Sequence, residues 1–217
     1  TRSLLYTDED IRIGQQHGFL VQNLPVIEFQ SCITDENQNA ILSLQENCLI
    51  VITSQMAVHF LFESQCREQF QKALHSQKVL AVGKKTAKSL RNNSIDPTIV
   101  GEYGIEQMLQ SQSCLEWSKY HAVFLVTANH KENLLDFANR AQFLSVKIIP
   151  VYTSYCPFYD NIITSINSLS PDVISFGSGE TIKNFISYFS SSTSAEKFLK
   201  TKTVAVLGKS AYEMAQK

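Results

Sequence analysis

The sequence predicts an α/β protein of two similar domains, each a parallel sheet flanked by helices. Short β-branched, apolar runs alternate with segments whose apolar residues recur at helical spacing, which is typical of parallel sheets covered on both faces. Several of these segments recur about 125 positions later in the chain. The 217 residues, 44% of them hydrophobic, suit two domains that each bury a core.

The internal repeat joins three pairs of segments at nearly one offset. The segment Leu24-Pro25-Val26 recurs as Ile149-Pro150-Val151, and residues 79–84 recur as residues 204–209, both 125 positions later. Residues 49–54 recur as residues 173–178, 124 positions later. General likeness among α/β units is the alternative explanation, but a shared offset favours a duplication.

Each repeated segment has the pattern of a strand, a tight turn and a helix. Residues 49–53 are continuously apolar until Thr53, as in a strand buried on both faces. Ser54 and Ser178 then stand where a helix N-cap belongs, and apolar residues follow each of them at helical spacing. Gly83 and Gly208 are expected to end strands and to begin helices in the same way.

The predicted elements indicate how the domains are built. Five strands are expected in the middle of the chain, at 48–53, 78–82, 97–100, 122–126 and 146–149, with a helix marked by Leu134, Leu135, Ala138 and Ala141. Neither end of the chain holds enough elements for a domain alone. We therefore expect one domain from residues 1–30 plus 155–217, an inserted domain at 35–149, and a two-strand hinge near 25–34 and 149–155. The serine-rich stretch 187–194 is expected to be a surface loop.

The first residues allow two interpretations. The repeat aligns Thr127 with Thr1, which would place a first strand before Thr1. Alternatively, Leu4-Leu5-Tyr6 is the strand and Asp8 to Gln16 form a short helix. In either case the end-built domain lacks a final strand, and we expect it to be trimmed at both ends.

Composition excludes several classes of protein. The formal net charge of −1, from 19 basic and 20 acidic residues, does not predict binding to nucleic acid. The apolar runs are too short to span a bilayer, and we expect a cytoplasmic protein without a signal peptide. An odd number of widely spaced cysteines predicts free thiols in a reducing compartment, with Cys48 as a core residue. No zinc-ligand spacing, GxGxxG motif or P-loop appears in the sequence, so no metal or nucleotide site is predicted.

The ordered set of short motifs resembles the uroporphyrinogen-III synthase family over nearly the whole chain. Thr1-Arg2, Ile52-Thr53-Ser54, residues 81–87 (AVGKKTA), Pro150-Val151-Tyr152 and the strand ends near 174–178 and 206–209 are similar to the family's motifs. Two features depart from it. Ala211 stands where the family often has threonine, with Ser210 as a substitute, and residues 127–131 (TANHK) replace a segment often richer in glycine and arginine.

The resemblance implies that the chain cyclises hydroxymethylbilane to uroporphyrinogen III, with inversion of ring D, loss of water and no cofactor. A transient contact with hydroxymethylbilane synthase is a further implication. Tyr152 is the catalytic candidate, since the matching hinge tyrosine of the family faces the cleft. The candidate substrate-binding residues are Thr53, Ser54, Gly83, Thr86, Ser178 and Ser210, at strand ends whose following helix N-termini favour carboxylates.

Simpler interpretations remain for each candidate. Ser54 and Ser178 are good N-caps in any protein, and lysines near these turns, such as Lys84 and Lys85, are most often solvated. Tyr152 competes with Tyr155 and Tyr159 as a proton donor. The rival functions are a non-enzymatic two-domain protein that binds a small anion, and a signalling pair, which the lack of an acidic pocket at the strand ends disfavours.

Overall fold

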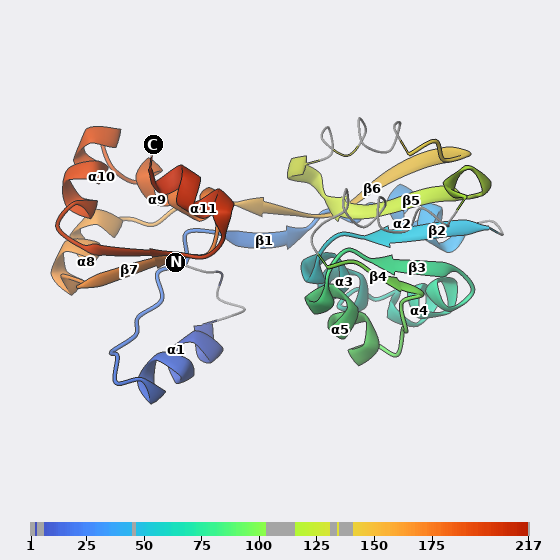
Figure 1. The fold of residues 1–217 in the computed structure, drawn as a ribbon, viewed down its shortest axis with the longest axis horizontal. Coiled ribbons are helices and arrows are strands. Elements are labelled where there is room, and N and C mark those ends of the chain that lie inside the picture. The colour runs from blue at the N-terminus through green and yellow to red at the C-terminus, as the bar shows by residue number, and fades with distance from the viewer. Residues whose placement is uncertain are drawn as a thin grey trace. The chain divides into compact units, whose positions relative to one another are not determined.

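A computed structural model describes residues 3, 7–44, 47–102, 116–130, 134 and 141–216, with the backbone alone at Thr7, His130, Lys209 and Ser210 (Figure 1). The chain divides into two compact units. Unit 1 comprises Thr1–Phe29 and Tyr155–Lys217, and unit 2 comprises Gln30–Ser154. The chain passes from one unit to the other within β1 (Glu28–Ser31) and again within β6 (Ser145–Tyr155).

Some predictions lie outside the described residues. They concern the motif Thr1-Arg2, the strand Leu4-Leu5-Tyr6, and most of the helix marked by Leu134 and Ala141, including Leu135 and Ala138. The predicted helix Asp8–Gln16 is confirmed as α1 (Thr7–Gln16).

Unit 2 is built on a six-stranded sheet with the order β1-β6-β5-β2-β3-β4. The strands β2 (Cys48–Ile52), β3 (Lys78–Ala81), β4 (Ile99–Val100) and β5 (His121–Thr127) pair in parallel, and β6 runs parallel to β5. All five residues of β2 are buried, as its unbroken apolar sequence predicts. The predicted sheet of parallel strands is therefore confirmed.

Two helices of unit 2 begin where the sequence predicts, α3 (Gln55–Phe62) after Ser54 and α5 (Lys84–Asn92) after Gly83. The sequence did not predict α2 (Asp35–Leu42), α4 (Arg67–His75) or the short 3₁₀ helices η2 (Trp117–Lys119) and η3 (Ala128–His130). Helix α3 packs against both α4 and α5, and α2 packs against α4, so these four helices form one layer. The layer lies against the sheet through contacts of α3, α4 and α5 with β2 and β3.

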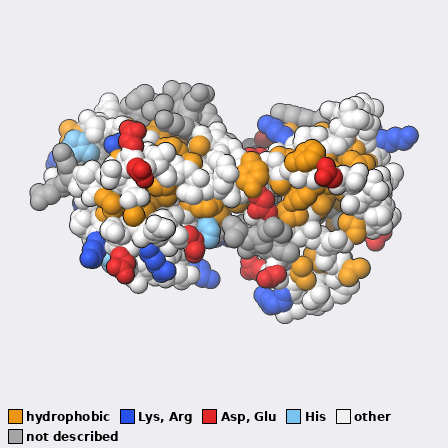
Figure 2. Space-filling model, turned by 180° about the vertical axis from the view of Figure 1, so that it is seen from behind, with side chains coloured by type: hydrophobic (Ala, Val, Ile, Leu, Met, Phe, Trp, Pro, Cys, Tyr) orange, Lys and Arg blue, Asp and Glu red, His pale blue; other side chains and the backbone are white. Residues whose placement is uncertain are grey.

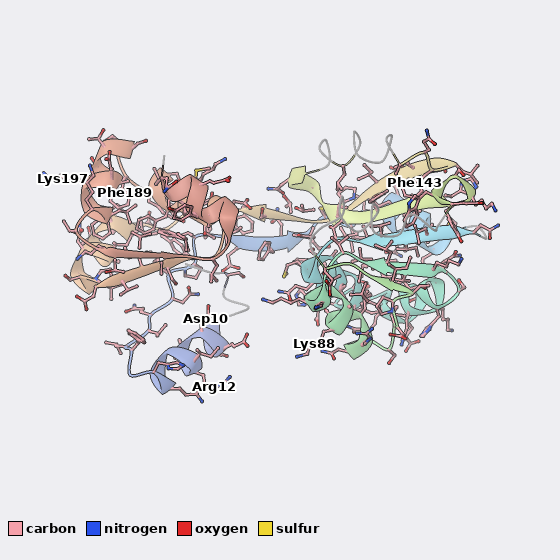
Figure 3. All side chains as sticks on the ribbon, in the orientation of Figure 1. Asp10, Arg12, Lys88, Phe143, Phe189 and Lys197 are labelled. Atoms are coloured by element: carbon pink, nitrogen blue, oxygen red, sulfur yellow. The ribbon has the colours of Figure 1, made fainter. Side chains whose placement is uncertain are left out.

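The core on one face of this sheet is formed by Leu49, Val51, Leu80 and Phe124 with their neighbours. Because side chains alternate along a strand, Ile50 and Ile52 point to the opposite face. The first face is covered by residues around Trp117 and by Leu134, Ala141 and Phe143, not by the α2–α5 layer. Phe143, labelled in Figure 3, meets Phe124 edge-on with ring centroids 6.1 Å apart.

Unit 1 is built on a smaller sheet, in which β7 (Val173–Phe176) and β8 (Thr203–Val206) pair in parallel. Around it lie α8 (Ile162–Leu169), α9 (Gly179–Ser187), α10 (Ser192–Leu199) and α11 (Lys209–Ala215). The core joins Phe176 and Phe185 to Val26, which comes from the first part of the chain. Phe189, labelled in Figure 3, packs against this cluster at 5.4 Å from the Phe185 ring.

Two expectations need correction. The strand predicted to end at Ile149 continues through Pro150 as a single strand to Tyr155, and a β-bulge between Val126 and Thr127 shifts the pairing of β5 with β6. The stretch 187–194 is not a loop throughout, because α10 begins at Ser192 and Ser191 caps it by accepting a hydrogen bond from the backbone N–H of Ser194. Serines there begin a helix whose buried residue is Ala195.

The surface is of mixed charge. On the face seen in Figure 2, basic and acidic side chains are interspersed, with hydrophobic side chains between them. Among the described helices, none combines the length and the apolar character needed to cross a membrane. Cys48 is buried, as predicted, and the described cysteines Cys32, Cys48, Cys66 and Cys156 are free thiols; Cys114 lies outside the described residues.

Candidate active site

The carboxyl ends of the parallel strands in unit 2 bring several predicted residues to one edge of the sheet. Ile52 of β2 is paired with Ala81 of β3 and with Leu125 of β5. Thr53 and Ser54 therefore follow one strand at the level where Gly83 follows the next. In open parallel sheets this edge is where ligands bind.

Ser54 makes two contacts at this edge. It is the N-cap of α3, and its Oγ accepts a hydrogen bond from the backbone N–H of Ala57 at 3.1 Å. The same Oγ lies 3.0 Å from the hydroxyl of Tyr152, with which it shares a hydrogen bond. The structure thus brings together two residues that are 98 positions apart and that were both predicted to belong to the site.

Tyr152 is held on β6 by its ring as well as by its hydroxyl. Its side chain is 7% exposed and stacks on Phe60 of α3, with ring centroids 5.9 Å apart and an interplanar angle of 15°. The bulge in the β5–β6 pairing lies directly beside it, since Val126 pairs with Pro150 while Thr127 pairs with Tyr152. Bulges of this kind re-aim side chains near active sites.

The beginning of α5 offers backbone donors. Gly83 is its N-cap, with extended backbone, and among the described residues no side chain caps this helix. The first amide groups of a helix point out of its N-terminus, where they can bind an anion. Thr86 lies in this first turn but is 4% exposed, so its hydroxyl is largely withdrawn from solvent. Lys84 forms an exposed ion pair with Glu102 at 3.0 Å.

Unit 1 repeats the arrangement with different details. Ser178 caps α9 by accepting from the backbone N–H of Thr181 at 3.2 Å, and Thr181 Oγ1 accepts in turn from the backbone N–H of Ser178. Gly208 precedes α11 with a φ of 83°, which glycine adopts without strain. The side chain of Ser210 lies outside the described residues, as does Lys131.

The rival tyrosines differ from Tyr152 in their surroundings. Tyr155, at the end of β6, is 44% exposed. Tyr159 is half-buried, and burial, with a smaller contribution from the Glu28 carboxylate, raises the pKa of its phenol. A raised pKa makes Tyr159 a weaker acid than a free tyrosine.

A cavity of about 520 Å³ in unit 1 contains none of the predicted site residues. It is lined by residues 156–159 and 161–164 together with Ser187 and Tyr188. The Tyr188 hydroxyl donates to the carbonyl oxygen of Pro157 and lies 3.3 Å from Cys156 Sγ. Burial, together with this thiol, raises the pKa of Tyr188, so it remains a neutral phenol.

The site of unit 2 has the chemistry of neutral hydrogen bonding. Its groups are hydroxyls and helix-terminal amides, and the described residues contain no group of three or more His, Cys, Asp or Glu side chains placed to hold a metal ion. Hydroxyls and helix-terminal amides can donate hydrogen bonds to an anion, and the Tyr152 phenol carries a proton that can be donated. The sequence did not single out Phe60 or Asn129, whose contacts with β6 complete the surroundings of Tyr152.

Comparisons with known proteins agree with this architecture. A profile of the family described as uroporphyrinogen-III synthase HemD matches residues 9–217. The fold is similar to that of a mutant uroporphyrinogen III synthase from Thermus thermophilus, with a TM-score of 0.65 and 16% identity over 98% of this chain and 85% of that chain. It is also similar to a uroporphyrinogen-III synthetase from Helicobacter pylori, with a TM-score of 0.60 and 17% identity over 92% of this chain and 93% of that chain.

The comparison with individual curated sequences gave no match. At 16–17% identity, the two solved structures support the fold alone, and they agree with a mostly parallel sheet flanked by helices.

Proposed function

This chain belongs to the uroporphyrinogen-III synthase family of haem biosynthesis, and from that premise we propose that it converts hydroxymethylbilane to uroporphyrinogen III as a hydro-lyase. The observation that carries the proposal is the family match over residues 9–217. The substrate is a linear chain of four pyrroles with eight carboxylates. The reaction inverts ring D, closes the macrocycle and releases one water molecule, and we propose that it needs no cofactor.

Tyr152 is the proposed proton donor for the leaving hydroxyl group. As the carbon–oxygen bond breaks, the phenol gives its proton to the departing oxygen, which leaves as water. Ring closure releases a proton from the attacked pyrrole carbon, and this proton restores the phenol. Because a free tyrosine has a pKa near 10, the acid is weak and its contribution is modest.

Ser54 is proposed to assist Tyr152 directly. Its Oγ already accepts from the N–H of Ala57, so its own proton is free to be donated to the Tyr152 oxygen, 3.0 Å away. A hydrogen bond to that oxygen stabilises the phenolate that forms when the proton is given up.

The carboxylates of the substrate are proposed to bind at the strand ends. The binding groups are the hydroxyls of Thr53, Thr86, Ser178 and Ser210 and the helix-terminal amides beside Ser54 and Gly83. Thr86 is the weakest of these, because its side chain is buried. Holding the two ends of a flexible chain together lowers the barrier by roughly 7–11 kcal/mol in favourable intramolecular cases.

We further propose that the strand pair near 25–34 and 149–155 is a hinge between an end-built domain of residues 1–30 plus 155–217 and an inserted domain at 35–149. Support comes from the division of the chain into two units, whose boundaries fall within β1 and β6. A cytoplasmic location and a transient contact with hydroxymethylbilane synthase, which supplies the unstable substrate, complete the proposal.

A coupled assay tests the function. Porphobilinogen and its deaminase generate hydroxymethylbilane, which closes spontaneously to the I isomer when no synthase is present. Addition of the protein should shift the product to the III isomer, separated from the I isomer by chromatography after oxidation. Formation of the I isomer alone would overturn the proposal and favour a non-enzymatic protein that binds a small anion.

A further inference from the structure

The side chain of Asn129 forms a dense set of hydrogen bonds with the segment that follows Tyr152. Its Oδ1 accepts from the backbone N–H of Ser154 at 3.2 Å and from the Thr153 hydroxyl at 2.6 Å. Its Nδ2 donates to the carbonyl oxygen of Ser154 at 3.1 Å and to the Ser154 hydroxyl at 3.0 Å. One amide side chain therefore binds both backbone polar groups of Ser154.

These contacts continue the β5–β6 ladder beyond the end of β5. The last paired residues are Thr127 and Tyr152, after which the chain leaves β5 and forms η3. Asn129 lies in η3, two residues beyond the last paired residue of β5, and its side-chain amide binds the backbone of Ser154, two residues beyond Tyr152. The backbone N–H of Ser154 can only donate a hydrogen bond, so the atom of Asn129 that faces this N–H must be the acceptor Oδ1 and not Nδ2.

A second asparagine holds β6 on the other side of Tyr152. Asn37 of α2 donates through Nδ2 to the carbonyl oxygen of Pro150 at 3.2 Å. Pro150 stands at the bulge, where the regular pairing with β5 is shifted. Tyr152 thus lies between two points, Pro150 and Ser154, at which asparagine side chains bind the backbone of β6.

We propose that Asn129 is a positioning residue for Tyr152, an inference that rests on the proposed function. By fixing Ser154, it fixes the strand segment that directs the Tyr152 ring onto Phe60 and its hydroxyl onto Ser54. Without Asn129 the end of β6 gains freedom just beyond the bulge. The phenol then spends less time in the orientation that meets the leaving hydroxyl, while carboxylate binding at the helix ends is unaffected.

The kinetic test is the variant Asn129→Ala in the full chain. We expect kcat for the III isomer to fall roughly tenfold and KM to change by less than about twofold, because small misplacements of a catalytic group act on the chemical step. Asn129→Asp keeps the acceptor oxygen but loses both donated bonds, so its kcat should lie between those of the wild type and Asn129→Ala. The matched control is Asn92→Ala, at the exposed end of α5, which should retain the wild-type kcat.

A double-mutant cycle separates positioning from general weakening. In a Tyr152→Phe background, Asn129→Ala should change kcat by less than about twofold, because the group it positions has been removed. An equal loss of kcat in both backgrounds would overturn the positioning role. A wild-type kcat for Asn129→Ala would also overturn it. If the alanine variant does not fold, a wild-type kcat for Asn129→Asp is the corresponding contradicting result.

Amide hydrogen exchange gives a readout independent of turnover. Exchange of the Ser154 amide should be roughly tenfold faster in Asn129→Ala than in Asn92→Ala, since its acceptor is lost. Unchanged exchange at Ser154 would show that the contact does not hold the strand, and would overturn the inference. Wild-type protein that forms no III isomer would instead overturn the proposed function itself.

Discussion

The two serine-capped helices of the repeat, α3 in unit 2 and α9 in unit 1, differ in what their N-cap serines do. Ser178 belongs to a closed capping box, in which Thr181 returns a hydrogen bond to the Ser178 backbone. Ser54 has Ala57 at the equivalent position, which cannot return a bond. Its hydroxyl is shared instead between the helix and Tyr152.

The comparison shows how one local pattern can have two surroundings. Thr181 binds the backbone N–H of Ser178 and not its hydroxyl, so both serine hydroxyls accept from a helix amide and keep a proton of their own. At Ser54 the neighbouring strand β6 places the Tyr152 hydroxyl within hydrogen-bond distance of that serine. The difference between the two caps therefore depends on what the neighbouring strand presents, not on the serine.

The sheets of the two units also differ in how completely they are covered. Every residue of β2 is buried, whereas β7 alternates between exposed and buried residues and leaves Val173 47% exposed. Leu207, just beyond β8, is 67% exposed. Among the described residues of unit 1, the buried apolar side chains gather around Phe176 and Phe185.

The largest expected effect comes from these buried side chains. Phe185→Ala should lower the free energy of unfolding of unit 1 by about 3–5 kcal/mol, because it leaves a cavity among the rings of Phe176, Phe189 and Phe198. Amide hydrogen exchange should accelerate throughout unit 1 but not in unit 2. Phe124→Ala is the matched variant in unit 2 and should show the reverse pattern. Acceleration in both units for either variant would contradict separate cores.

The next effect concerns the reacting phenol. Tyr152→Phe should lower kcat about 100-fold, at the low end for a general acid, and should leave the fold intact because the ring still stacks on Phe60. The measurement is the III-isomer rate in the coupled assay, with circular dichroism to check folding. Tyr155→Phe, which alters an exposed ring nearby, is the control and should keep the wild-type rate. Wild-type turnover of Tyr152→Phe would remove Tyr152 from the mechanism.

The comparison of the two caps is tested by Ser54→Ala and Ser178→Ala. Each should cost about 1 kcal/mol of stability as a lost N-cap. Ser54→Ala should also lower kcat roughly tenfold through Tyr152, the value of one hydrogen bond. Ser178→Ala should instead raise KM about fivefold with kcat unchanged, as expected for a carboxylate contact of roughly 1 kcal/mol. Identical kinetic changes in the two variants would show that the caps have not diverged in function.

The smallest effect concerns the exposed ion pair of Lys84 with Glu102. Glu102→Gln should change the free energy of unfolding by less than about 0.5 kcal/mol. It removes one acidic partner of Lys84 near the beginning of α5, so KM should fall by up to about twofold at low salt and return to the wild-type value as salt screens the charge. Glu196→Gln removes the exposed partner of Lys200 on α10 and should leave KM unchanged at every salt concentration.

Much of the fold follows from local sequence. The apolar run before Thr53 predicts β2 to within one residue, and Ser54 and Ser178 predict the beginnings of α3 and α9. The hinge strand predicted near 149–155 lies within β6, but its continuity with the strand predicted at 146–149 was not foreseen. That continuity depends on the bulge against β5, and pairing between strands cannot be read from the local pattern.

The candidate site was only partly predictable, because some of its contacts join residues that lie far apart in the sequence. Ser54 and Tyr152 were singled out separately, one as a cap and one by resemblance, and the structure joins them. Phe60 looks like one more apolar residue of α3, and Asn129 like a loop residue after a strand. Their roles depend on contacts with a strand far along the chain, which no helical or strand periodicity records.

Because unit 2 is one uninterrupted stretch while unit 1 is divided by it, the two cannot mature in the same way on a ribosome. All of unit 2 is synthesised before the second part of unit 1, so its sheet can begin to form during synthesis. The carbonyl oxygen of Val26 accepts a hydrogen bond from Asn184, which lies 158 positions later. The first segment of unit 1 therefore stays without these core partners until the second segment has been made.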